Sequence, residues 1–146
     1  MLSFPAFDYR FQKQNGKLYI WDIVRKCYVL ITPEEWVRQH TIHYLVRQGY
    51  PVGRMSVEKV FFYQQLTKRV DIVVWSERGS PLVLVECKAP NISISKNTLE
   101  QIAIYQACVP ARFWIITNGI EIFFVDVSLP NTFFNQIPPF DSLTKF

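Results

Sequence analysis

Residues 70–88, VDIVVWSERGSPLVLVECK, contain two apolar runs that each carry a carboxylate. Asp71 lies near the start of the first run, and Glu86 lies near the end of the second, two positions before Lys88. Burying a charged group costs free energy unless the group is paired or binds a metal. Acids in runs this apolar are therefore expected to be paired or to bind a metal, and these two possibilities imply different functions.

The segment between the two runs predicts a turn, because it contains Arg78-Gly79 followed by Ser80-Pro81. The whole stretch is then a β-hairpin. A turn centred on Arg78 and Gly79 places Asp71 opposite Glu86, with Cβ atoms about 4.5–5.5 Å apart. A single bulge would change this register.

Strand alternation predicts Glu86 and Lys88 on one face and Cys87 on the other. Together with Asp71, these side chains would form one charged patch. Two carboxylates suit a hard divalent cation such as Mg²⁺. A neighbouring lysine can orient or deprotonate a water molecule, or offset charge on a phosphate. The alternative is structural, with Glu86 and Lys88 as an ion pair at a strand end.

The composition indicates one globular domain, and the element order given below makes it an α/β domain. The chain has 146 residues, 49% hydrophobic and 16% aromatic, and a net charge of +4, which is weakly in favour of a polyanionic partner. The first residues have no signal-peptide pattern, and no apolar run is long enough to span a membrane. Three widely spaced cysteines fit neither a disulfide framework nor a zinc motif, so we expect a cytoplasmic protein.

Turn and cap signals divide the chain into elements. Asn15-Gly16 predicts an N-terminal hairpin, and Thr32-Pro33 followed by Glu35 predicts a capped helix that ends near Gly49. We expect further elements in this order: strands over 55–66, 69–76 and 82–88, a helix over 98–108, and a hairpin over 112–126. The chain would then comprise a β leader (1–31), a core (32–126) and an irregular tail (127–146).

This element order and its motifs resemble the PD-(D/E)xK nuclease superfamily, whose core is an αβββαβ unit with a mixed sheet flanked by helices. Within it, the chain is similar to the N-terminal nuclease domain of type I restriction enzyme R subunits, of the RecB-like kind. The matching segments lie between residues 25 and 126: Leu30–His40, Lys68–Val73, Val85–Pro90, Gln101–Tyr105 and Ile116–Gly119.

The resemblance implies a metal-dependent DNA nuclease of the restriction-endonuclease type, using Mg²⁺ or Mn²⁺. Asp71 and Glu86 would bind the metal with the backbone carbonyl of Cys87, and Lys88 would be the catalytic lysine. The family also places an acid on the first helix. Glu35 fits that role, although its capping position explains it equally well and Glu34 is the neighbouring candidate.

Gln101 and Tyr105 match the Q-x-x-x-Y element of the subgroup. Four residues apart on a helix, they share a face and could point toward the acids and the DNA backbone. The alternative is a solvated glutamine and a tyrosine at the edge of the core. His40 and His43 are three apart on the first helix, but the sequence offers no third ligand for zinc.

The chain lacks the G-x-x-x-x-G-K-[ST] phosphate loop, so no nucleotide-driven motor is expected in it. A nuclease of this kind would act on DNA alone, as a homodimer or with a separate subunit. A second hypothesis is a nuclease-fold module that binds nucleic acid or a partner subunit without cutting.

Overall fold

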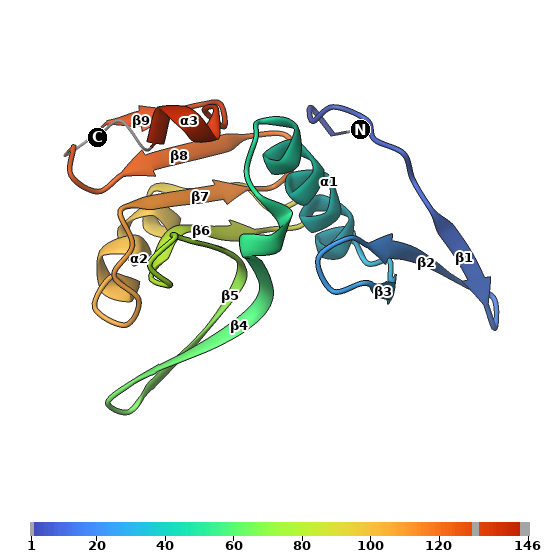
Figure 1. Ribbon diagram of the computed structural model, residues 1–146, viewed down its shortest axis with the longest axis horizontal. Coiled ribbons are helices and arrows are strands. Elements are labelled where there is room, and N and C mark those ends of the chain that lie inside the picture. Colours follow the sequence, from blue (N-terminus) through green and yellow to red (C-terminus); the bar gives the residue numbers. More distant parts are fainter. Residues whose placement is uncertain (1, 130–131, 144–146) are drawn as a thin grey trace.

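The computed structural model describes residues 2–129 and 132–143 (Figure 1). A six-stranded mixed sheet has the strand order β4-β5-β6-β7-β8-β9. Its strands are antiparallel except for the parallel pair β6–β7. They comprise β4 (Met55–Tyr63), β5 (Leu66–Trp75), β6 (Pro81–Cys87), β7 (Phe113–Thr117), β8 (Ile122–Asp126) and β9 (Phe133–Phe134).

One helix covers each face of this sheet. Helix α1 (Pro33–Arg47) packs Val37, Ile42 and Leu45 into a core with one set of alternate strand residues, and α2 (Lys96–Tyr105) packs Ile102 against the other set. Both faces of the central strands are therefore apolar, as the sequence of β6 indicates. The crossover through α2 joins the parallel strands β6 and β7.

Helix α1 begins and ends as predicted. The Thr32 side chain accepts a hydrogen bond from the Glu35 backbone N–H at 3.0 Å, and Pro33 occupies the first turn. Gly49 follows the helix with φ of +89°, a backbone conformation that favours glycine. A short 3₁₀ turn, η1 (Val52–Arg54), then leads into β4.

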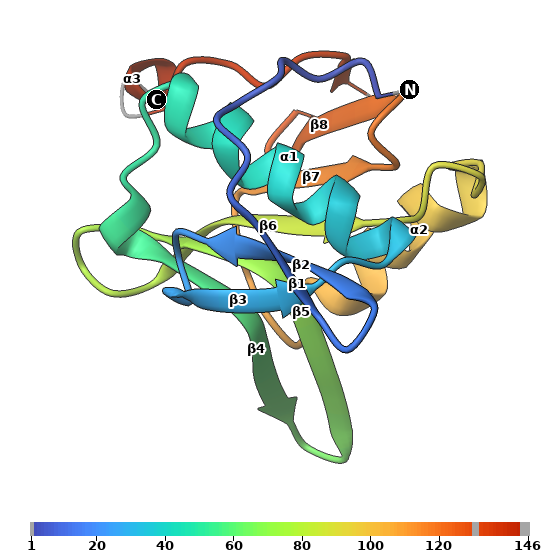
Figure 2. The same cartoon turned by 90° about the vertical axis from the view of Figure 1, so that its right-hand side faces the viewer.

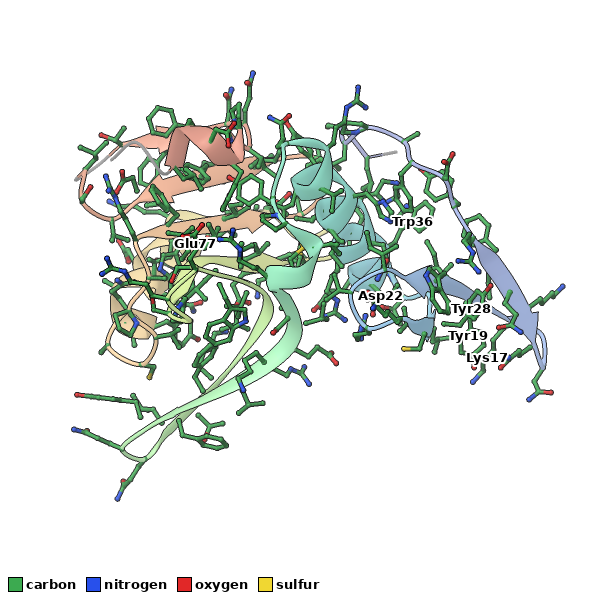
Figure 3. All side chains as sticks on the ribbon, viewed as in Figure 1. Lys17, Tyr19, Asp22, Tyr28, Trp36 and Glu77 are labelled. Carbon is green, nitrogen blue, oxygen red and sulfur yellow. The ribbon has the colours of Figure 1, made fainter. Side chains whose placement is uncertain are left out.

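The leader forms a separate three-stranded antiparallel sheet of β1 (Phe11–Gln14), β2 (Lys17–Asp22) and β3 (Cys27–Leu30). Asn15 and Gly16 both have positive φ in the predicted hairpin turn. The sheet lies beside α1, and Asp22 lies between the two, with Trp36 on the same side of the helix (Figures 2 and 3). The stack of Tyr9 on Trp36 helps hold the leader there.

The predicted register of β5 and β6 is confirmed next to the acids. Ile72 pairs with Val85, and Val74 pairs with Val83. The turn itself is not symmetric about Arg78 and Gly79, because a bulge shifts the pairing so that Trp75 lies opposite Pro81. This bulge lies on the turn side of the paired residues, and the paired stretch ends at Ile72 and Val85, one residue short of the two acids.

Several boundaries differ from the prediction. Strand β4 ends at Tyr63 rather than at 66, and β5 begins at Leu66 rather than at 69. Helix α2 spans Lys96–Tyr105 rather than 98–108. The tail is not wholly irregular, since it contains β9 and a four-residue helix α3 (Phe140–Leu143). Phe140 and Leu143 are buried, and the Phe140 N–H donates to the carbonyl of Gln48 at 2.8 Å. Positions 130–131 and 144–146 of the predicted tail lie outside the described residues.

None of the helices in the described part of the chain has the length and apolar character needed to cross a membrane.

Candidate active site

A pocket of about 50 Å³ brings together four of the predicted site residues, Glu86, Lys88, Gln101 and Tyr105. Glu86 is the second-to-last residue of β6, Lys88 directly follows that strand, and the other two lie on α2. Lys68 of β5 lines the same pocket. Residues from three elements therefore meet around a space large enough for water or a small ion. The Q-x-x-x-Y pair faces the strand that carries the E-x-K motif.

Glu86 is the most perturbed acid of this pocket. Burial, followed by the charge of Asp71, raises its pKa to about 7, and the charges of Lys68 and Lys88 act in the opposite direction. The Lys68 ammonium lies 3.0 Å from Glu86 Oε1 and 4.3 Å from the centroid of the Tyr105 ring. The ion pair of Glu86 in this structure is thus with Lys68, across two strands, and not with the neighbouring Lys88.

Asp71 lies beside the pocket rather than among its lining residues. Its Oδ2 accepts a hydrogen bond from the Cys87 backbone N–H at 2.7 Å, and its Oδ1 accepts one from Arg38 at 3.2 Å. The charge of Asp71 still raises the pKa of Glu86, so the two carboxylates are close enough to repel. The sequence predicted that Asp71, Glu86 and Lys88 form one charged patch. In the structure, Glu86 and Lys88 line a pocket and Asp71 lies at its edge.

A local distortion of β5 accounts for this position. Val70 packs on the α2 side of the sheet and Ile72 on the α1 side, although they are two residues apart. In β4, Glu58 lies at the matching point of the ladder and has φ of +57°. Non-glycine residues in this conformation are strained and concentrate at functional sites.

Glu35 does not line the pocket. Its carboxylate binds Arg25 at 2.7 Å and Arg38 at 2.8 and 2.9 Å. Burial acts to raise the pKa of Glu35, but the hydrogen bonds from Arg38 and Arg25 outweigh it and lower that pKa. Arg38 lies between Glu35 and Asp71 and bonds both, so the helix acid reaches the site through an arginine. Glu34 is exposed at the start of the helix.

The side chains at this site are suited to binding a divalent metal ion. Asp71 and Glu86 supply oxygen donors, and Mg²⁺ typically binds one or two carboxylates and keeps several waters. The repulsion that raises the pKa of Glu86 is the kind that a cation relieves. Across residues 2–129 and 132–143, no three His, Cys, Asp or Glu side chains are grouped as metal ligands.

Cys87 fits the expected role of a backbone donor. Its side chain is 1% exposed and packs on the α1 side, opposite Glu86, with Sγ 3.8 Å from Thr41 Oγ1. Burial raises the pKa of the Cys87 thiol well above its usual value. The side chain therefore stays protonated, and the backbone carbonyl is the group of this residue that suits a hard cation.

His40 and His43 have roles in packing. The two ring nitrogens of His40 lie 2.8 Å from the Trp36 carbonyl and 2.9 Å from the Tyr9 hydroxyl, and the His43 ring stacks on Phe7. Burial lowers the pKa of both histidines. They hold the leader against α1.

The sequence interpretation missed the ionic network behind Asp71. Arg25, Arg38 and Gln39 connect Asp22 of the leader to the site, with Gln39 donating to Asp22 at 2.9 Å. The i, i+3 spacing of Glu35 and Arg38 on a capped helix was the available signal. The partner across the sheet was not visible, because nothing in the spacing of Arg38 and Asp71 marks them as neighbours.

Glu86 predicts a pH effect on the metal-free protein. The pKa of Glu86 is about 7 in the folded protein, compared with the usual value of 4.5 for the unfolded chain. As the pH rises from 4.5 to 7, the unfolded chain therefore loses this proton before the folded protein does. The free energy of unfolding therefore falls between these values, by about 3 kcal/mol from this group. Glu86→Gln removes the ionisation, and we expect its stability relative to wild type to increase from pH 5 to pH 8.

Urea denaturation in EDTA measures this difference. A stability difference between Glu86→Gln and wild type that stays constant across the window would contradict the prediction.

The mixed sheet with a helix on each face, and the pocket at the end of β6, define a restriction-endonuclease-like fold. The model of the family "Type I restriction enzyme R protein N terminus (HSDR_N)" matches residues 33–140. The chain therefore belongs to that family, which confirms the resemblance seen in the sequence.

Two solved structures are similar in fold. One is a fragment of a candidate HsdR subunit of a type I restriction enzyme from Vibrio vulnificus, with 20% identity and a TM-score of 0.62. The match covers 79% of this chain and 25% of that one, so the chain spans a quarter of that chain's length. The other is a candidate nuclease of the DUF820 group from Anabaena variabilis, with 12% identity, a TM-score of 0.52, and coverage of 97% and 88%. No curated protein matches the sequence significantly.

Proposed function

We propose that this domain is a metal-dependent DNA nuclease that hydrolyses phosphodiester bonds as an endonuclease. The observation that carries the proposal is the convergence of Glu86, Lys88, Gln101 and Tyr105 on one pocket, with Asp71 at its edge. Membership of the R-subunit N-terminal family supports the same activity. Restriction-type cleavage also fits the basic charge of the chain.

Each residue has a role in the proposed reaction. Asp71, Glu86 and the Cys87 carbonyl would hold Mg²⁺ or Mn²⁺, which would supply charge neutralisation at the phosphate. Lys88 would orient a water molecule and assist its deprotonation. The water oxygen bonds to phosphorus, the P–O3′ bond breaks, and the 3′ oxygen takes up a proton. Gln101 and Tyr105 would position the DNA backbone, while Glu35 would act through Arg38 to position Asp71.

Metal titration with matched variants tests the metal site. We expect Asp71→Asn to weaken Mn²⁺ binding at least tenfold in calorimetry, because it removes one of two charged donors. Glu121→Gln is a control, since it also removes one carboxylate charge but lies at an exposed position in the β7–β8 hairpin. Equal Mn²⁺ affinity in Asp71→Asn and wild type would remove this residue from the site.

A cleavage assay tests the activity itself. The protein is incubated with supercoiled plasmid and with single-stranded DNA, each with Mg²⁺, Mn²⁺ or EDTA. We expect cutting in the presence of metal and none in EDTA. A metal site without cutting would favour the alternative function, a module that binds DNA or a partner subunit. This second candidate is kept because type I restriction enzymes, the family context of this chain, are built from several subunits.

A further inference from the structure

Strands β4 and β5 continue as a two-stranded ribbon beyond the rest of the sheet (Figures 1 and 2). The pairing of β5 with β6 begins at Ile72, whereas its pairing with β4 extends to Leu66 opposite Tyr63. We call residues 59–70 the β-arm. A two-stranded ribbon is at best marginally stable in water by itself, so its projection into solvent calls for a function.

The β-arm carries basic and apolar side chains and no acid. Its cations are Lys59, Lys68 and Arg69. Near its tip, Phe62 is 76% exposed, and Tyr63 and Leu66 are also exposed. Clustered exposed apolar groups typically mark an interaction site, and a basic surface without acids fits a polyanion.

The tip turn is built from Gln64 and Gln65 instead of the Asn-Gly that such turns favour. Gln64 has φ of +54°, the left-handed conformation in which a glutamine is strained. Both residues are exposed. The turn therefore presents two exposed amide side chains although one of them requires a strained backbone. Glutamine amides are suited to hydrogen bonds with base edges.

The two faces of the β-arm are distinct. Phe61 pairs with Lys68, and Tyr63 pairs with Leu66, so these four side chains share one face. Lys68 on this face contacts Glu86 and Tyr105 in the pocket. The exposed Tyr63 and Leu66 are therefore on the same face of the ribbon as the side chain that enters the candidate active site.

We propose that the β-arm enters the groove of duplex DNA and holds the backbone over the pocket. The major groove of B-DNA is about 12 Å wide and accepts a two-stranded ribbon. From Lys68 to Gln64 the ribbon extends about 13 Å, longer than the groove is deep. Lys59 and Arg69 contact phosphates, and Phe62 and Tyr63 contact the bases. A second copy of the chain is a poorer occupant, because each copy carries a net charge of +4.

The inference rests on the proposed nuclease function, so the experiment separates binding from cutting. Full-length protein with Lys88→Ala is titrated onto a fluorescein-labelled 30-base-pair duplex, followed by anisotropy at several salt concentrations. Two further variants are made in this Lys88→Ala protein. One adds Phe62→Ala with Tyr63→Ala, and the other adds Lys59→Ala with Arg69→Ala. The controls are Phe133→Ala, an exposed aromatic residue of β9, and Lys13→Ala with Lys17→Ala in the leader.

We expect loss of the aromatic pair to weaken binding about tenfold or more at every salt concentration. Loss of the basic pair should lower the slope of log K against log salt by about 1.8, since each phosphate contact contributes about 0.9. The controls should stay within twofold.

Affinities and slopes that are equal in β-arm variants and controls would overturn the proposal. Two further results would also overturn it: no duplex binding by the parent protein, and β-arm substitutions that dissociate a homodimer in sedimentation without changing DNA binding. Failure of the nuclease proposal is a separate result, because it is read from the plasmid assay and not from this titration.

Discussion

Replacing Lys88 with alanine is expected to lower the rate of DNA cleavage by about 10²–10⁴-fold, the usual contribution of a positioned acid–base group. The side chain lines the pocket beside Glu86. Its backbone N–H, which donates to the Thr117 carbonyl at 2.8 Å, is unaffected by the substitution. The fold should therefore be retained, and circular dichroism with thermal denaturation checks this.

Lys68 is the competing candidate for the catalytic lysine, because it lines the same pocket. Its ammonium is committed to Glu86 and to the face of the Tyr105 ring, at 3.0 and 4.3 Å. We therefore expect Lys68→Ala to reduce cleavage less than Lys88→Ala does. Lys13→Ala, an exposed lysine of β1, serves as the control and should cut as wild type does.

Two additions sharpen the result for Lys88. Lys88→Arg keeps the positive charge but cannot give up a proton, so partial activity would assign an electrostatic role and no activity would assign proton transfer. Ethylamine should partly restore Lys88→Ala if the missing amine is the only defect. Cleavage by Lys88→Ala at the wild-type rate would exclude this lysine from the reaction.

Turns and helix caps were predicted correctly, because their formation depends on residues that are adjacent in the sequence. The turn at Asn15-Gly16 and the cap at Thr32 need only neighbouring residues, and both are present. The alternation of apolar residues in β5 and β6 also predicted their register, because one slipped residue would move every core side chain to the wrong face. The pocket residues follow from this register and from the helix spacing of Gln101 and Tyr105.

The features that were predicted incorrectly depend on contacts between residues far apart in the sequence. The end of α2 and the tail were misplaced because their boundaries depend on tertiary contacts. Gln106, just beyond α2, binds Trp114 and the Ala111 carbonyl through its side chain, and the Gln48 amide donates to the Ile137 carbonyl. Prolines near Phe140 favoured an irregular tail, yet burial of that ring stabilises a short helix.

The placement of Asp71 shows why site geometry is harder to predict than register. A regular strand would present Asp71 on the Glu86 side, but the distortion at Glu58 interrupts the alternation. The carboxylate then meets Arg38 from α1, a residue that no motif links to the acids. Glu35 is a similar case, because its carboxylate binds two arginines, and its expected role at the metal stays a prediction.

Arg38→Ala is expected to destabilise the fold by about 3–5 kcal/mol, the cost of removing one partner from a buried ionic network. The Arg38 side chain is 7% exposed and forms ion pairs with Glu35, Asp71 and Glu58. Burial by itself lowers the pKa of Arg38, but Glu35 and the other acids outweigh it and raise that pKa. Its removal leaves buried carboxylates without their main counter-charge.

Arg54→Ala is the matched control. Arg54 forms an ion pair with Glu77 at 3.7 Å, but Glu77 is 86% exposed and the pair lies at the surface. Such pairs contribute at most about 1 kcal/mol, so we expect a loss no larger than that. Chemical denaturation at pH 7 measures both variants, and a similar small loss in each would show that the Arg38 network does not stabilise the fold.

A second substitution separates the positioning role of Arg38 from its effect on stability. In Arg38→Lys, a single ammonium replaces the guanidinium that bridges Glu35 and Asp71, so charge is retained but the bridge is not. Since Arg38 holds Asp71 Oδ1 at 3.2 Å, loss of the bridge should lower metal affinity even where the protein remains folded. If Arg38→Lys binds Mn²⁺ as tightly as wild type does, the arginine stabilises the helix–sheet contact without positioning Asp71.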